Sequence, residues 1–105
     1  MKITRLNQAP KVPFDLDGYI LANHANVEII HLHLKPGERI EKHTNPFDVI
    51  FYILEGKAML ESDLERILVM KDQSIVIEAG VNRGIENISV GDFKLLVIKL
   101  HHTKK

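Results

Sequence analysis

Residues 43–56, HTNPFDVIFYILEG, begin with side chains that could bind a metal ion and continue as an apolar segment. His43 follows the turn residues Pro36 and Gly37 and leads into that segment. Side chains alternate between the two faces of a β-strand, so a metal site here would place its second ligand two residues after the histidine. That position holds Asn45, and one imidazole with one amide oxygen does not bind a divalent transition metal tightly.

Short apolar segments bounded by turn residues must position these side chains. We expect β-strands at 27–34, 49–54, 74–77 and 93–100. Residues 57–61 should form the hairpin partner of 49–54, and residues 62–70 should form a turn followed by another strand. Residues 79–84, AGVNRG, predict a glycine-containing loop, and no segment has the length and periodicity of a stable helix. Many short strands separated by Gly and Pro turns indicate an all-β sandwich or barrel.

The last expected strand, 93–100, is apolar on both faces. One face carries Phe93, Leu95 and Val97, and the other carries Leu96, Ile98 and Leu100. A strand that is buried on both faces requires a second sheet or another subunit against its outer face. Because burying one such side chain contributes about 1.5–3 kcal/mol, we expect a homodimer joined sheet to sheet.

Length and charge restrict the class of protein. A chain of 105 residues forms one domain, and we expect residues 1–26, with Pro10 and Pro13, to be an N-terminal arm or edge strand on a body formed by 27–105. Hydrophobic residues make up 45% and charged residues 27%, an ordinary globular balance. The formal net charge is zero, which argues against a nucleic-acid surface and gives no basis for attraction to anionic membranes.

Cysteine content and hydropathy indicate the compartment. The sequence contains no cysteine, which fits a reducing compartment and removes thiolate chemistry. The first residues, MKITRLNQAPKVPFD, lack the apolar core of a signal peptide, and no apolar run approaches the ~18 residues of a membrane span. We therefore expect a cytoplasmic protein.

Two motifs make the chain resemble a small single-domain cupin over residues 27–100. The first cupin motif is G, five residues, H-x-H, three or four residues, E, six residues, G, and it matches Gly37, His43 and Gly56. The second is G, five residues, P-x-G, two residues, H, three residues, N. DQSIVIEAGVNRGIEN aligns with it without a gap, matching Gly80 and Asn87 and replacing the glycine, the proline and the histidine by Asp72, Glu78 and Arg83.

The resemblance implies a double-stranded β-helix jelly-roll barrel with a short N-terminal arm and with the motif residues at the barrel mouth. In this register Ile30, Leu32 and Leu34 face the barrel interior. His31 and His33, despite their zinc-like H-x-H spacing, would lie outside, on the surface or near the contact between subunits.

The resemblance also implies where a metal would bind. The family's three histidines and one glutamate fall on His43, Asn45, Val49 and Arg83, and Asp48 is offset by one residue, which turns it to the other face. Val49 donates nothing, and the guanidinium of Arg83 has no lone pair. Two like unit charges ~4 Å apart repel each other by roughly 4 kcal/mol at an effective dielectric of 20. The guanidinium of Arg83 would repel a divalent ion by about twice that amount. We expect no transition metal and no other cofactor, with only His43 retained from the ligand set.

The residues at these positions suit an organic ligand. An arginine fork binds carboxylate or phosphate, an amide offers a donor and an acceptor, and a histidine can move a proton. We therefore expect a small anionic or polar molecule to be held by His43, Asn45 and Arg83, between apolar walls formed by Phe51 and Ile53. Lys99 either reaches the barrel rim or extends outward into solvent.

Two other functions remain open from the sequence. The first is an enzyme, either an isomerase- or epimerase-like catalyst with His43 as base or a metal-dependent oxygenase, although the sequence shows no partner that would orient a base and we favour a non-catalytic role. The second is an assembly module with a vestigial site, in which Arg83 pairs with an internal carboxylate. The fold alone does not select among these functions.

Overall fold

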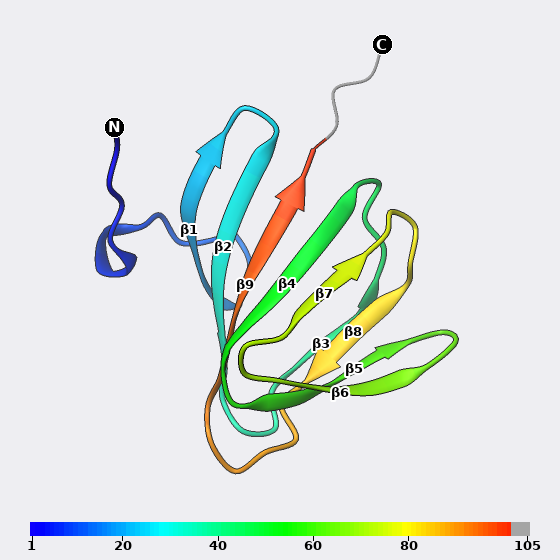
Figure 1. Cartoon of the computed structure of the whole chain (residues 1–105). Coiled ribbons are helices and arrows are strands. Elements are labelled where there is room, and N and C mark those ends of the chain that lie inside the picture. Colours follow the sequence, from blue (N-terminus) through cyan, green and yellow to red (C-terminus); the bar gives the residue numbers. More distant parts are fainter. Residues whose placement is uncertain (102–105) are drawn as a thin grey trace.

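The computed structural model describes residues 1–101, which form two antiparallel sheets facing each other (Figure 1). The five-stranded sheet has the order β1 (Asp17–His24), β2 (Val27–Leu34), β9 (Phe93–Leu100), β4 (Asp48–Glu55) and β7 (Ser74–Ile77). The four-stranded sheet has the order β3 (Arg39–His43), β8 (Arg83–Glu86), β5 (Lys57–Ser62) and β6 (Arg66–Met70). A short 3-10 turn, η1 (Leu6–Gln8), precedes them. This arrangement confirms the all-β jelly roll. None of the described residues belongs to a helix long and apolar enough to cross a membrane.

The core lies between the sheets and follows the alternation of the sequence. In β2, Ile30, Leu32 and Leu34 are buried, whereas the side chains of His31 and His33 remain partly exposed on the opposite face. On the inner face of β9, Phe93, Leu95 and Val97 are buried, whereas Leu96, Ile98 and Leu100 on its outer face are half-buried in the single chain. The period-two pattern therefore predicted which face of each long strand points inward.

One predicted pairing is wrong. Residues 57–61 are not the hairpin partner of 49–54, because β4 pairs with β7 and β9, and β5 pairs with β6 and β8. The chain changes sheets at Gly56, which has a positive φ of 83°. A Cβ at Gly56 would collide with the backbone of Asp92 and Phe93, so the chain crosses β9 too closely for any other residue.

The turn that follows β5 matches the expectation for residues 62–70. The hydroxyl of Ser62 accepts hydrogen bonds from the backbone N–H groups of Leu64 and Glu65, both at 3.2 Å. The hydroxyl thus satisfies the backbone of a turn rather than the start of a helix, and β6 begins at Arg66.

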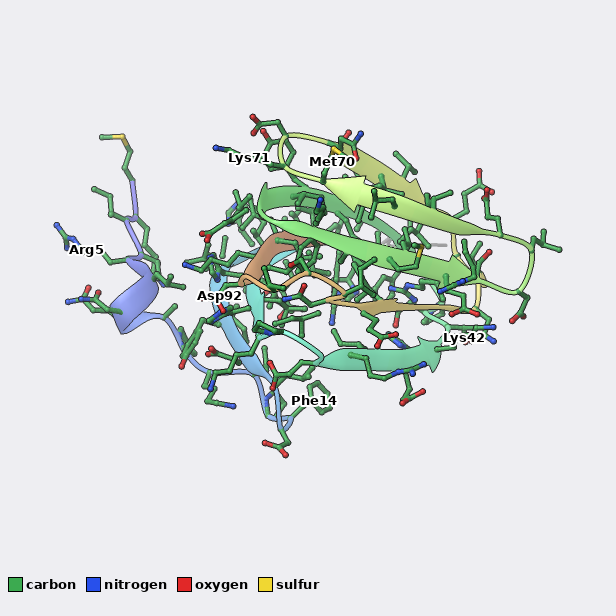
Figure 2. All side chains as sticks on the ribbon, turned by 90° about the horizontal axis from the view of Figure 1, so that it is seen from below. Arg5, Phe14, Lys42, Met70, Lys71 and Asp92 are labelled. Atoms are coloured by element: carbon green, nitrogen blue, oxygen red, sulfur yellow. The ribbon has the colours of Figure 1, made fainter. Side chains whose placement is uncertain are left out.

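Residues 1–26 contain both a segment outside the sheets and an edge strand. β1 lies at one edge of the five-stranded sheet, and the residues before it run alongside it. The N–H of Val12 donates to the carbonyl of Gly18 at 2.9 Å, and the N–H of Ile20 donates to the carbonyl of Pro10 at 2.7 Å. Figure 2 shows Arg5 well away from the barrel and Phe14 next to it.

Asn87, the last residue of the second motif, has a structural role. It is fully buried, and its Nδ2 donates to the carbonyls of Leu34 at 3.0 Å and Gly91 at 2.8 Å. Its Oδ1 accepts from the backbone N–H and the hydroxyl of Ser89, at 3.0 and 2.7 Å. These bonds tie the loop after β8 to the end of β2.

Candidate functional site

A cavity of about 280 Å³ lies between the two sheets. Its walls are mostly apolar and include Ile30, Leu32, Ile40, Phe51, Ile85 and Val97 from the strands. Four polar side chains also line it, and they are His43, Asn45, Arg83 and Lys99. A mostly apolar cavity with a few polar groups is typical of a small-molecule site.

The start of β8 holds Arg83 inside the barrel. Arg83 is only 4% exposed, and it stands opposite His43 in the pairing of β3 with β8. The pairing is irregular between Ile40 and His43, and a Cβ on Gly84 would collide with the Ile40 carbonyl. The glycine therefore lets the two strands approach closely enough to bring the Arg83 side chain against the chain of β3.

Arg83 and Asn45 form one hydrogen-bonded unit. Arg83 Nη1 donates to the backbone carbonyl of His43 at 3.2 Å. With its amide oriented by its partners, Asn45 donates to the Thr44 carbonyl at 3.2 Å and accepts from Arg83 Nη2 at 2.8 Å and Nη1 at 3.3 Å. Asn45 thus occupies the end of the guanidinium fork.

The remaining edge of the guanidinium has no protein acceptor among residues 1–101. A guanidinium carries five N–H groups, and the bonds to His43 and Asn45 use both of those on Nη1 and one on Nη2. Nε is buried and has no hydrogen-bond partner. Nε and the second N–H of Nη2 lie side by side, and this is the edge with which arginine binds a carboxylate in bidentate fashion.

The charge of Arg83 is also not compensated within the described part of the chain. No carboxylate there lies within ion-pair distance, and burial alone lowers the pKa of the Arg83 guanidinium, which stays charged at neutral pH. The Phe51 ring lies 5.9 Å from its Cζ and supplies a cation–π contact. The internal carboxylate that a vestigial site would require is therefore not found among residues 1–101.

His43 stands at the mouth of the cavity, where it is exposed to solvent. Its Nδ1 lies 3.1 Å from the backbone carbonyl of Glu41. A carbonyl oxygen only accepts, so this bond fixes the proton of the neutral ring on Nδ1 and leaves the lone pair on Nε2.

The structure separates the other residues named from the sequence. Phe51 forms a wall of the cavity, but Ile53 is fully buried in the core and does not line it. Lys99 does line the cavity, and its Nζ lies 3.9 Å from Glu28 Oε1, which places it at the rim.

The sequence-based interpretation missed one wall of the cavity. Val12, Phe14 and Leu16, from the segment before β1, also line it. The signal was present as alternating apolar residues in VPFDL, which contains Pro13 and follows Pro10, and this is the pattern of an extended segment packed on one side.

The residues at the ligand positions of the family do not fit a metal ion. Val49 is fully buried in the core, and the guanidinium of Arg83 already holds the Asn45 oxygen. Asp48 is turned away, and its carboxylate accepts from the backbone N–H of Ala79 at 2.9 Å. Among residues 1–101 no three His, Cys, Asp or Glu side chains converge as a metal site would require.

Residues 30–99 match the cupin domain family, and the chain therefore belongs to that family. It is 31% identical over 58 residues to the tetracenomycin polyketide synthase protein TcmJ of Streptomyces glaucescens. That match covers 54% of this chain and 39% of TcmJ, so the chain spans well under half of that relative.

Solved structures share the whole fold. An RmlC-like cupin family protein with a double-stranded β-helix fold from Methanocaldococcus jannaschii superposes with a TM-score of 0.81 at 24% identity, over 97% of this chain and 92% of that one. A predicted oxalate decarboxylase from Thermotoga maritima gives a TM-score of 0.84 at 16% identity, over 97% and 100%. At such identities the likeness establishes the double-stranded β-helix fold alone.

Proposed function

We propose that this cupin domain binds a small organic anion in its barrel without a transition metal. The observation that carries the proposal is the buried Arg83, whose charge has no carboxylate partner among residues 1–101. A buried charge is costly unless it is paired and hydrogen-bonded. A ligand carboxylate on the edge formed by Nε and Nη2 would supply both the countercharge and two acceptors.

The surroundings of Arg83 support an anionic group at this end of the cavity. Asn45 holds the guanidinium in a fixed orientation, and Lys99, which lines the same cavity, has its charge paired with Glu28 at 3.9 Å, which leaves Arg83 as the cation for the ligand. The description of the Thermotoga maritima structure as a predicted oxalate decarboxylase is compatible with carboxylates as the ligand class. The lack of cysteine in the sequence supports a reducing, cytoplasmic setting for this activity.

The proposal is tested by comparing two arginines. Thermal shift and titration calorimetry with a panel of small carboxylates and inorganic phosphate would be run on wild type, Arg83→Met and Arg66→Met. We expect at least one carboxylate to stabilise wild type, by about 2.7 kcal/mol at a hundredfold excess over its Kd. Arg83→Met should weaken that binding at least about tenfold, equivalent to 1.4 kcal/mol.

Arg66 is the matched control because it is exposed and already lies 3.8 Å from Glu61. Arg66→Met removes the same charge from the chain and should leave the affinity within about twofold, since exposed charges are screened by water and salt. Equal loss in both variants would mean that net charge, not the site, attracts the anion. A panel in which no anion stabilises wild type would refute the proposal.

A second candidate, proton transfer, is favoured by His43. The bond from Nδ1 to the Glu41 carbonyl orients the ring and leaves Nε2 free to accept a proton at the cavity mouth. Exchange of a ligand's α-proton in D₂O, followed by NMR, would detect such a base. His43→Gln should abolish the exchange while the ligand still binds, and no exchange with wild type would leave binding as the function.

A further inference from the structure

We infer that the ligand is a monocarboxylate with an apolar body, and that the loop of residues 12–16 recognises this body. The inference rests on the proposed anion site and specifies the rest of the molecule that fills it. The polar groups are unevenly distributed along the cavity wall.

The polar groups gather at one end of the barrel. His43 ends β3, Arg83 begins β8, and Lys99 is close to the end of β9, so the three lie at the same end of the sheets. The strand residues that line the rest of the cavity are apolar. A molecule with its anionic group at Arg83 must therefore place its remaining atoms against an apolar surface.

The loop 12–16 closes the side of the cavity between the edge strands β1 and β3. β1 is the edge of one sheet and β3 is the edge of the other, and Phe14 lies near the start of β3 (Figure 2). Val12, Phe14 and Leu16 line the cavity from this side. The loop thus contributes three apolar side chains where neither sheet continues.

Hydrogen bonds and close packing give the loop a defined shape. Lys11 Nζ donates to the carbonyl of Leu16 at 2.8 Å and to that of Phe14 at 3.2 Å. Val12 is 6% exposed and packs on Gly18, where a Cβ would collide with Leu32. A loop held in this way can act as a preformed wall.

Phe14 shows that this wall is incomplete in the single chain. It lines the cavity and yet remains 63% exposed. Covering the surface of an aromatic ring is favourable, and an apolar ligand body in the cavity would cover the ring of Phe14. The position of Phe14 therefore fits a contact with ligand better than a contact within the core.

The volume limits the size of the body. An apolar cavity of about 150 Å³ holds a benzene ring, so about 280 Å³ leaves room for one ring or a short chain together with its carboxylate. A second carboxylate would have to lie among the apolar walls or at Lys99, whose Nζ is already 3.9 Å from Glu28. The cavity therefore favours one anionic group and one apolar body.

Calorimetric titration of the intact protein with acetate, butanoate, hexanoate, hexan-1-ol and hexanedioate tests the inference. Affinity should rise about fourfold for each added CH₂ group, the equivalent of about 0.8 kcal/mol. Hexan-1-ol and hexanedioate should each bind at least about tenfold more weakly than hexanoate, since one lacks the charge and the other buries a second one.

Variants of the loop locate the effect. Phe14→Ser should lower the affinity for hexanoate about tenfold and leave acetate unchanged, because only the longer ligand reaches the ring. Phe14→Leu keeps the apolar surface and should restore most of the affinity. Val90→Ser is the control, because Val90 is fully exposed and does not line the cavity.

The outcomes separate this inference from the anion site itself. If acetate and phosphate bind and hexanoate binds no better, the apolar body is wrong and the anion site stands. If Phe14→Ser weakens acetate and hexanoate equally, the loop does not recognise the body. If hexan-1-ol binds as tightly as hexanoate, or if no anion binds at all, both the inference and the anion site are refuted.

Discussion

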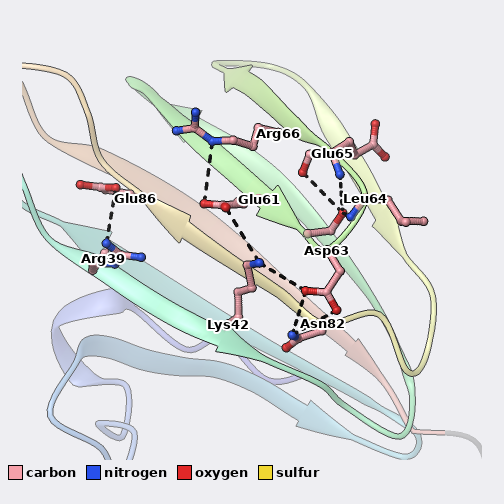
Figure 3. A network of polar contacts seen from close by, with 10 residues as sticks. Arg39, Lys42, Glu61, Asp63, Leu64, Glu65, Arg66, Asn82 and Glu86 are labelled. Atoms are coloured by element: carbon pink, nitrogen blue, oxygen red, sulfur yellow. Dashed lines mark hydrogen bonds and ion pairs between the residues drawn. The ribbon is translucent and has the colours of Figure 1, made fainter.

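The cationic side chains on the two faces of the four-stranded sheet differ in whether they have carboxylate partners. On the outer face Arg39 pairs with Glu86, Lys42 with Glu61 and Asp63, and Arg66 with Glu61, at 3.2–3.9 Å (Figure 3). Arg39 also pairs with Glu41 at 3.3 Å. On the inner face Arg83 has a backbone carbonyl and an amide oxygen but no carboxylate among residues 1–101. Carboxylates are thus placed where water already solvates the cations.

This distribution is the reverse of what fold stability requires. An exposed ion pair contributes about 0–1 kcal/mol, whereas an unpaired buried charge destabilises the folded state by much more. Asn87 shows that the same fold can satisfy a buried polar residue completely. The contrast supports the proposal that Arg83 is arranged for a partner from outside the chain.

Restoring the family's ligands inside the barrel should produce the largest effect. Wild type purified without added metal should carry well under one transition-metal ion per chain by elemental analysis. The triple variant Asn45→His, Val49→Glu, Arg83→His replaces the repelling charge by donors, and its affinity for zinc should rise at least about a thousandfold. Arg83→His alone should raise it only modestly. Stoichiometric metal in the wild-type barrel would contradict the claim that the uncompensated charge of Arg83 on the inner face keeps metal ions out.

Removing the buried charge should stabilise the ligand-free protein or leave it unchanged. An unpaired buried charge destabilises the folded state, and even buried ion pairs can often be replaced by apolar residues of similar volume at no loss or with a gain of about 1–4 kcal/mol. We expect this of Arg83→Met in urea unfolding without ligand, together with the loss of anion binding. Arg66→Met should change stability by less than about 0.5 kcal/mol. A strong destabilisation by Arg83→Met would mean that Arg83 is a structural residue.

The outer faces of the two sheets should also differ in self-association. The outer face of the four-stranded sheet carries the ion pairs of Figure 3 beside the exposed Leu68 and Met70. On the five-stranded sheet, Ile98 and its neighbours in β9 form a half-buried apolar outer face without such ion pairs around Ile98. We predict a homodimer through this face, with His31 and His33 near the contact. Ile98→Lys should shift the protein to monomer in light scattering, and Met59→Lys, on the charged sheet, should not. A wild type that stays monomeric over a wide concentration range would contradict it.

The sequence predicted the fold where strands are long and apolar. β2, β7 and β9 begin and end where the alternation predicted, because burial of one face determines the register. β3 and β8, with the sequences RIEKH and RGIE, carry too few apolar residues to be recognised, although they bring His43 and Arg83 together. Their strand structure comes from the pairing of β8 with β3 on one side and with β5 on the other, rather than from local sequence.

The candidate site was predicted in part for the same reason. The motif register named His43, Asn45 and Arg83, and the structure brings them to one cavity. Ile53 was assigned to the wall from its face alone, but its depth in the core is a property of the packed sheets. The loop 12–16 reaches the cavity only because β1 and β3 are edge strands, and a sequence does not reveal sheet order.

The smallest test of the contrast compares the environments of two histidines on the outer face of β2. His33 lies between Asp17 and Asp92, at 3.0 and 3.3 Å. At His31, burial, Lys94 and His33 together hold the pKa below its ordinary value of 6.5, against the opposing effects of a backbone hydrogen bond and of Asp17. The unfolded chain therefore binds more protons at residue 31 than the folded one between the lowered pKa and 6.5. The contribution of residue 31 to stability must then rise with pH through this window, and it is lost as the pH falls through the same window.

Replacing His31 by glutamine should remove that contribution. In urea unfolding measured at about pH 7.5 and about pH 5.5, wild type should lose more stability on acidification than His31→Gln does. The carboxylates titrate in both proteins, so the difference between the two losses isolates residue 31. His31 is partly exposed, whereas Arg83 is buried inside the barrel, so the effect at His31 should be small. An equal or larger loss in His31→Gln would show that the protonated ring is accommodated on this face, and that the scarcity of compensating charge is confined to the cavity.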